Sequence, residues 1–147
     1  MQQLHTGLAL VIGVIVAFAL PVCAQSPDRQ ANCAAQAKIA FDDLTHEYRD
    51  VLESLNIPFA IMANGYEAHY SGKVERCLFL VRKVASVLER TSYISYLLDV
   101  ANRNMYALYV STDGKMESCA LIPSVPETKA CKDRDEFDAF VAKYMQR

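Results

Sequence analysis

Apolar residues recur at spacings of three and four from Cys33 onward, which is the pattern of one stripe along an amphipathic α-helix. The stripe consists of Cys33, Ala37, Ala40, Phe41, Leu44, Tyr48, Val51, Leu52 and Leu55. Ser26-Pro27-Asp28 supplies a capping hydroxyl, a first-turn proline and an early acid, and Asn56-Ile57-Pro58 ends the pattern. We therefore predict a long helix from about Pro27 to Leu55.

Residues 57–73 are the least regular stretch of the chain. Asn64-Gly65 is a turn signal, and the apolar residues before it could form a short turn or strand that packs down. We expect this segment to be irregular and to lead into the sheet.

From Lys73 onward the pattern changes to β-branched and aromatic runs separated by turn residues. The expected strands are Val74 to Val87, Tyr93 to Val100, Met105 to Thr112 and Met116 to Ile122. Asp113-Gly114 is a strong two-residue hairpin signal before the last of them. The short connections predict a four-stranded antiparallel meander, followed by a loop over residues 123–128.

The predicted turns also predict a register. If residues 102–103 are central in their turn, Tyr96 lies opposite Tyr109 on the neighbouring strand. The same counting predicts one face with Leu97, Leu108 and Cys119, and another with Tyr96, Leu98, Tyr109 and Ala107. Neither face is polar throughout, so we expect both to be at least partly covered.

A second, shorter helix is predicted at residues 134–145. Asp133 followed by Glu136 is a capping-box variant, and Phe137, Phe140 and Tyr144 lie on one stripe. The chain has no internal repeat and no long linker. The fold class is therefore α+β in a single domain: a long N-terminal helix, the meander and a short C-terminal helix.

The N-terminal segment differs in composition from this domain, because its first 27 residues contain no Asp, Glu, Lys or Arg. Leu8 to Leu20 is uncharged and too short to cross a bilayer as a helix, and Pro21 and Val22-Cys23-Ala24 follow it. This layout predicts a signal peptide, residues 1–24, before a mature domain of residues 25–147, although no Lys or Arg precedes the apolar run. An uncleaved anchor and a lipoprotein acylated at Cys23 are the alternatives.

Charge adds to this picture because all 15 basic and 17 acidic residues lie from Asp28 onward. The net charge of -2 and the scattered arginines and lysines argue against nucleic-acid binding. We expect a periplasmic or secreted protein with no stable membrane insertion after cleavage.

The mature part keeps four cysteines, and an even number in an exported chain favours disulfides. Four cysteines allow three connectivities. We favour Cys33–Cys77 and Cys119–Cys131, because each pair links neighbouring predicted elements. A structural zinc site is the competing use, but the chain has no C-x-x-C knuckle.

Motifs for catalysis are absent from the sequence: there is no G-x-S-x-G, P-loop, G-x-G-x-x-G or H-E-x-x-H. We therefore expect no enzyme, cofactor or metal. His46 is interpreted as an exposed helix residue. His69 lies near Glu67, and such a pair could act as a base or as half of a metal site; the plainer interpretation is that His69 and Tyr70 pack at the start of the sheet.

Tyrosines are the other candidate for binding, since four of them fall in one predicted hairpin. A tyrosine offers an apolar ring with a polar tip, which suits both sheet packing and binding surfaces. The candidate binding residues are Tyr66, Glu67, His69, Tyr70, Tyr96 and Tyr109.

One resemblance covers nearly all of the mature chain. It is carried by Cys33…Gln36…Phe41, His69-Tyr70…Lys73…Cys77, Tyr106…Tyr109 and Cys119…Cys131…Glu136-Phe137…Tyr144-Met145. This spacing resembles a group of small exported four-cysteine bacterial proteins of uncharacterised function. In that group His-Tyr is typically followed by Asn, whereas this chain has Ser71. The resemblance implies export and a shared fold, and it carries over no catalytic residue.

Three functions follow as hypotheses. The first is a non-enzymatic exported module that binds a protein or small-molecule ligand through the sheet and residues 57–73. The second is a small periplasmic enzyme or metal-binding protein that uses His69 with Glu67. The third is an envelope component anchored by an uncleaved N-terminal helix.

Overall fold

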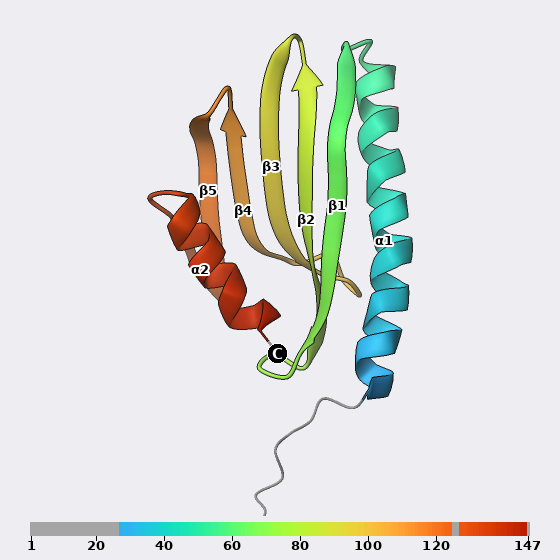
Figure 1. Ribbon diagram of the computed structural model, residues 1–147, viewed down its shortest axis with the longest axis vertical. Coiled ribbons are helices and arrows are strands. Elements are labelled where there is room, and N and C mark those ends of the chain that lie inside the picture. Colours follow the sequence, from blue (N-terminus) through green and yellow to red (C-terminus); the bar gives the residue numbers. More distant parts are fainter. Residues whose placement is uncertain (1–26, 125–126, 147) are drawn as a thin grey trace, which may run out of the picture.

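Six strands form one antiparallel sheet in which every strand pairs with the next along the chain (Figure 1). The computed structural model describes residues 27–124 and 127–146. In chain order the elements are α1 (Pro27–Ser54), β1 (Phe59–Ser71), β2 (Arg76–Val87), β3 (Arg90–Asp99), β4 (Met105–Thr112), β5 (Lys115–Ser124), β6 (Glu127–Ala130) and α2 (Arg134–Met145). The α+β class and both predicted helices are confirmed, whereas the predicted number of strands is wrong.

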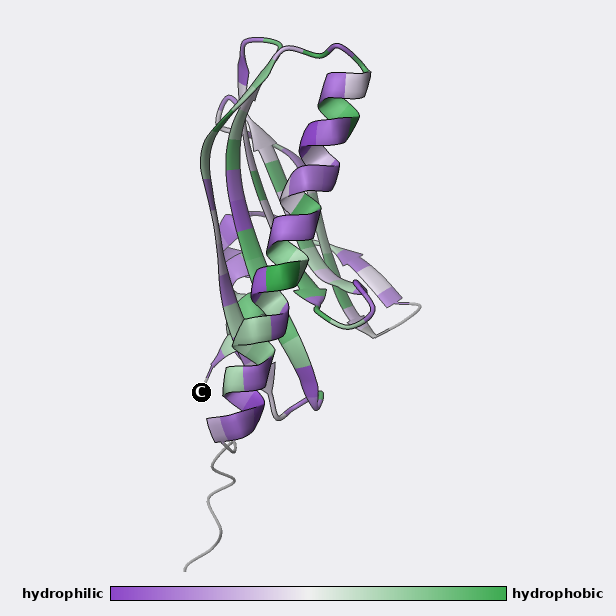
Figure 2. Cartoon of the chain, turned by 90° about the vertical axis from the view of Figure 1, so that its right-hand side faces the viewer, coloured by the Kyte–Doolittle hydropathy of each residue, from purple (hydrophilic) through white to green (hydrophobic). Residues whose placement is uncertain are grey.

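The two helices cover opposite faces of the sheet, with α1 alongside β1 and α2 across β4 and β5 (Figure 1). Strand β2 shows why both are needed, because Leu78 and Leu80 point to the α2 side while Phe79 and Val81 point to the α1 side. All four side chains are buried. Polar and apolar segments alternate along α1, as expected for an amphipathic helix that packs on one side only (Figure 2).

Strand β1 was expected to be irregular, yet it is the longest strand in the described chain. Asn64-Gly65 forms no turn, because these residues pair with Lys83 and Arg82 of β2 in the middle of the ladder. An added Cβ at Gly65 would meet nothing within 4 Å, so no close approach requires glycine there. Continuous pairing with β2 has overridden the local turn preference.

Strand β6 replaces part of the loop predicted at residues 123–128. Its four residues are all exposed, so no hydrophobic alternation marked it in the sequence. It pairs with β5 at Ala120 and Leu121, and Cys131 follows it directly. The strand forms one edge of the sheet, where a short and polar segment discourages pairing with another chain.

The register was predicted for the β3–β4 and β4–β5 pairs, and it is wrong by one residue over most of both. Tyr96 lies opposite Leu108, and Tyr109 lies opposite Ser95 and Cys119. Next to the Asp113-Gly114 turn the predicted register is correct, since Thr112 pairs with Lys115. The register then shifts between Val110 and Ser111. A second shift lies between Leu97 and Leu98. Each bulge adds one residue to one strand, which moves every later side chain to the other face.

These shifts change which residues share a face of the sheet. One face carries Leu97, Ala107, Tyr109 and Cys119 toward α2, and the other carries Tyr96, Leu98 and Leu108 toward the α1 side. The predicted cross-strand pair Tyr96–Tyr109 is therefore not formed.

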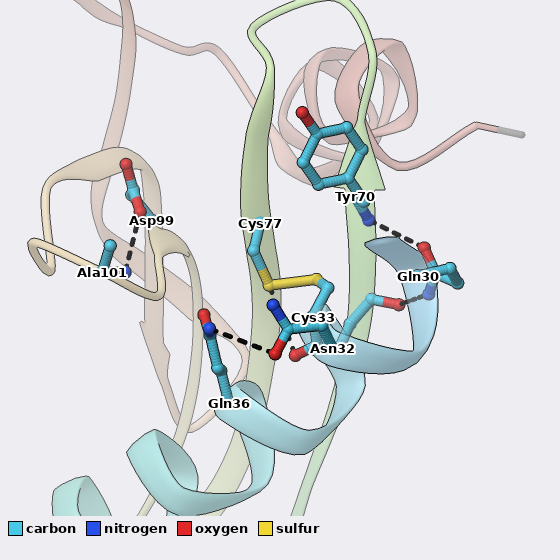
Figure 3. The surroundings of a disulfide bond; sticks show 9 residues. Gln30, Asn32, Cys33, Gln36, Tyr70, Cys77, Asp99 and Ala101 are labelled. Atoms are coloured by element: carbon cyan, nitrogen blue, oxygen red, sulfur yellow. Dashed lines mark hydrogen bonds between the residues drawn. A yellow bond between two sulfur atoms is a disulfide. The ribbon is translucent and has the colours of Figure 1, made fainter. Parts of the chain in front are cut away.

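The four cysteines pair as favoured, Cys33 with Cys77 and Cys119 with Cys131, with a Cα–Cα distance of 5.2 Å in each pair. Figure 3 shows the first bond between the start of α1 and the start of β2. Beside it, the Gln30 side chain donates to the Ala68 carbonyl at 3.0 Å and accepts from the Tyr70 amide at 2.8 Å. Gln30 thus pairs with the backbone of edge strand β1, and the disulfide and this amide together hold the first turns of α1 on the sheet.

The second bond holds the start of α2 beside β5. The cap is formed as predicted, because the Asp133 carboxylate accepts from the Glu136 amide and the Glu136 carboxylate accepts from the Lys132 amide, each at 2.9 Å. The first bond satisfies a backbone donor that a helix start leaves open, and the second ties the residue before the cap to the first turn.

Within the described ranges, no helix is long and apolar enough to span a membrane. The predicted signal peptide, residues 1–24, lies outside the described residues. Two disulfides are the kind of cross-link that persists in an oxidising compartment outside the cytosol.

We predict that the Cys33–Cys77 bond stabilises the fold more than the other. Its cysteines are 44 positions apart, against 12 for Cys119–Cys131. The chain-entropy model gives ~4 and ~3 kcal/mol for such loops as upper values. Urea denaturation of the double variants C33A/C77A and C119A/C131A, each beside the wild type, measures both losses. A larger loss for the Cys119–Cys131 variant would contradict the loop-length account.

Candidate functional site

The six candidate binding residues divide between the two faces of the sheet. Tyr66, Tyr70 and Tyr96 lie on the α1 side; Glu67, His69 and Tyr109 lie on the α2 side. The structure therefore does not bring them together as one site.

On the α2 side, the candidate residues are engaged in the protein's own packing. Tyr109 is 8% exposed, and its ring lies 5.8 Å from the ring of Phe137 in α2. His69 is buried opposite Leu78. The Glu67 carboxylate forms an ion pair with Arg82.

On the α1 side, two of the three tyrosines are also engaged with α1. The Tyr66 ring packs against Phe41 at 4.7 Å between centroids. The Tyr70 hydroxyl accepts from Arg29 at 3.3 Å, and the Arg29 guanidinium lies over its ring. Tyr96 remains, and its half-buried side chain lines a groove.

This groove, called the α1 groove below, lies between the second half of α1 and the sheet and has a volume of about 410 Å³. It is lined by Leu44, Glu47, Tyr48, Val51, Lys83, Ile94, Tyr96 and Leu108. It is larger than two other hollows, one of about 190 Å³ beside the Cys33–Cys77 bond and one of about 270 Å³ between α2 and β5.

Two repeating patterns bring these residues together. Positions 44, 47, 48 and 51 share one side of α1, because residues three and four apart are neighbours on a helix. On the sheet, Lys83 pairs with Ile94, and Tyr96 pairs with Leu108 in the adjacent row. Strands β2, β3 and β4 thus supply the floor, and α1 supplies one wall.

Lys83 is the unusual residue of the α1 groove. Its side chain is only 3% exposed, and the ammonium lies 4.0 Å from the centroid of the Tyr48 ring, a cation–π contact. Within the described chain no carboxylate pairs with it. Loss of water around the charge lowers the pKa of Lys83 below its ordinary value of 10.5.

Asn64 is the neighbour of Lys83 on β1. Its side-chain amide donates to the Thr45 hydroxyl at 3.1 Å, which ties β1 to α1. Its carbonyl oxygen Oδ1 is buried without a donor in the described structure. Buried polar groups of Asn64 and Lys83 therefore lie side by side on β1 and β2, next to a groove whose lining is mainly apolar.

The acid in the lining is already paired. Glu47 accepts two hydrogen bonds from the Arg103 guanidinium, at 2.7 and 3.1 Å. Arg103 belongs to the turn between β3 and β4, so this ion pair links that turn to α1. Burial raises the pKa of Tyr48 and that of Tyr96, and proximity to Tyr48 adds to the second shift.

Sequence reasoning found Tyr96 but missed Lys83 and the wall of α1. The sequence did contain a signal for Lys83. In the run VERCLFLVRKVASV this lysine alternates with Val81 and Ala85, which are both buried. Arg82 beside it points to the other face, and only the register decides which of the two basic residues is buried.

No family model matches this chain, and neither the curated proteins nor the solved structures include a significant match. The resemblance to exported four-cysteine proteins therefore stays a prediction. Among residues 27–124 and 127–146, no three His, Cys, Asp or Glu residues are grouped to hold a metal ion.

We predict that Lys83 makes stability depend on pH. Between its lowered pKa and 10.5, the unfolded chain holds a proton that the native protein has released, so the free energy of unfolding rises with pH. The raised pKa values of Tyr48 and Tyr96 act in the opposite direction, above about pH 10. Replacing Lys83 by methionine is expected to remove this increase in the free energy of unfolding and to leave the effect of the two tyrosines in place.

Urea denaturation of wild type and K83M at several values between about pH 8 and pH 10 measures the effect. The stability of the wild type relative to K83M is expected to increase with pH. Parallel pH profiles for the two proteins would show that Lys83 titrates alike in the folded and unfolded chains.

Proposed function

We propose that the protein is an exported, non-enzymatic binding protein that holds a small, mainly apolar ligand in the α1 groove. The observation that carries the proposal is an apolar groove of about 410 Å³ with one buried cation on its floor. Ligand sites are typically concave and apolar, with a few polar groups that orient the ligand.

The side chains that line the groove support recognition. Leu44, Ile94 and Leu108 offer apolar contact area, and Tyr48 and Tyr96 add rings with a polar tip. Val51 is 56% exposed at the rim, where a monomeric protein gains little from a large apolar side chain. A ligand over this rim would remove part of that surface from water.

Export is the second part of the proposal. It is supported by the layout of residues 1–24 in the sequence and by the two disulfides, which are typical of oxidising compartments. The resemblance to small exported four-cysteine bacterial proteins agrees with a periplasmic or secreted location. The partner is then a ligand met outside the cytosol.

We predict that the small neutral dye 4-(dimethylamino)benzonitrile, whose fluorescence reports on polarity, binds the wild type and that a carboxylate at the groove rim weakens this binding. V51D places the charge at the rim, and I39D places it at another exposed apolar position of α1 outside the groove lining. The dye affinity of V51D is expected to fall at least about threefold, since desolvating a new charge opposes an apolar ligand. The affinity of I39D is expected to stay near the wild-type value.

Fluorescence titration of the three proteins gives the affinities, and circular dichroism checks that each is folded. Equal affinities for V51D and I39D, or no binding to the wild type, would remove the α1 groove as the binding site.

We predict that the exported protein begins at Gln25. Intact mass spectrometry of the protein from the periplasm or medium of its native host measures the mature mass. A mass that includes residues 1–24 would instead support the envelope component with an uncleaved anchor.

A further inference from the structure

Lys83 is a buried cation for which residues 27–124 and 127–146 supply no counter-charge. A charge removed from water is costly unless an opposite charge or hydrogen bonds replace the water. The Lys83 ammonium contacts the face of the Tyr48 ring, and this cation–π contact compensates only part of the cost of removing the charge from water. Lys83 is one of the residues that line the open groove, and so is Tyr48, whose ring its ammonium contacts.

We propose that the ligand of the α1 groove is an aliphatic monocarboxylate, whose carboxylate pairs with the Lys83 ammonium and whose chain lies between α1 and strands β3 and β4. This inference rests on the proposed function, because it names the ligand class of the same groove.

The other charged groups described at the groove are paired with one another, which leaves Lys83 to attract an anion. Glu47, the acid in the lining, is neutralised by Arg103 and so repels an incoming carboxylate little. The Arg103 guanidinium also lies 3.8 Å from the Asp43 carboxylate, so its charge is shared between two acids. A phosphate ester would bring more charge, and both phosphate and sulfate esters would bring more acceptor atoms, than one ammonium can satisfy.

The apolar part of the lining fits the rest of such a molecule. Leu44 and Val51 on α1 lie across from Ile94 and Leu108 on the sheet. At ~30 Å³ per water-sized group, about 410 Å³ holds roughly a dozen non-hydrogen atoms. Decanoate, with ten carbons and two oxygens, is of that size.

The test compares three molecules that share one chain length: decanoate, decanol and decyltrimethylammonium, each below its micelle concentration. Isothermal titration calorimetry at about pH 7 is expected to give decanoate an affinity at least tenfold higher than either of the others, which is about 1.4 kcal/mol. In K83M this preference is expected to disappear, with decanoate weakened about tenfold and decanol unchanged.

K73M is the matched control. Lys73 also lies over a tyrosine ring, that of Tyr144 at 5.0 Å, but it is outside the groove lining. K73M is expected to bind all three molecules as the wild type does. A similar loss of decanoate affinity in K73M and K83M would overturn the specific role of Lys83.

A second measurement needs no variant. The affinity of the wild type for decanoate is expected to fall as pH rises through the pKa of Lys83, whereas its affinity for decanol stays constant. The titratable groups that face Lys83 are Glu47 and Tyr48 from α1 and Tyr96 from β3; β1 presents Asn64, which does not titrate. Burial raises the pKa of both tyrosines, and the Glu47 carboxylate is held in its ion pair with Arg103.

The outcomes separate this inference from the proposed function. If decanol and the neutral dye bind but decanoate has no advantage, or if the affinity for decanoate does not change with pH, the carboxylate assignment is wrong and the apolar groove remains. If none of the molecules binds the wild type, the proposed function fails and the inference fails with it.

Discussion

The attachment of α1 to the sheet is the constraint on which the α1 groove depends. The first turns of the helix are held by the Cys33–Cys77 bond and by the Gln30 side chain on β1. The small side chains of Ala37 and Ala40 then let the helix pack closely on the sheet, since both are buried. Farther along, larger residues take the same stripe, and the groove opens between them and β3 and β4.

The same constraint explains why a lysine is buried at position 83. Lys83 lies two residues after Val81 on β2, and therefore on the same face of the sheet. Pairing with β1 and β3 fixes this face, so the Lys83 side chain lies under α1 whatever its polarity. A methionine there would fill similar space without a charge to desolvate. Stability alone gives no reason for a cation at this position, whereas a ligand that brings the opposite charge does.

The sequence predicted correctly those features that depend on interactions between residues close together in the chain. The stripe of α1, the Asp133 cap of α2 and the Asp113-Gly114 hairpin depend on residues a few positions apart, and the structure has all three, with positive φ values of 52° and 79° in the hairpin. Strand β1 and the exposed strand β6 were missed, because pairing with neighbouring strands defines them. Of the candidate site, only Tyr96 was found, since the wall and floor of the groove come from segments far apart in the chain.

By itself the sequence determined the α+β class, both helices, the order of the meander and a favoured pairing of the cysteines. These follow from apolar periodicity, turn chemistry and the proximity of neighbouring elements. Only the tertiary structure decided which residues share a face. Side chains alternate along a strand, so the bulge opposite Leu97 and Leu98 sends Tyr109 to the α2 side. The register of β2 likewise sends Lys83 rather than Arg82 into the groove.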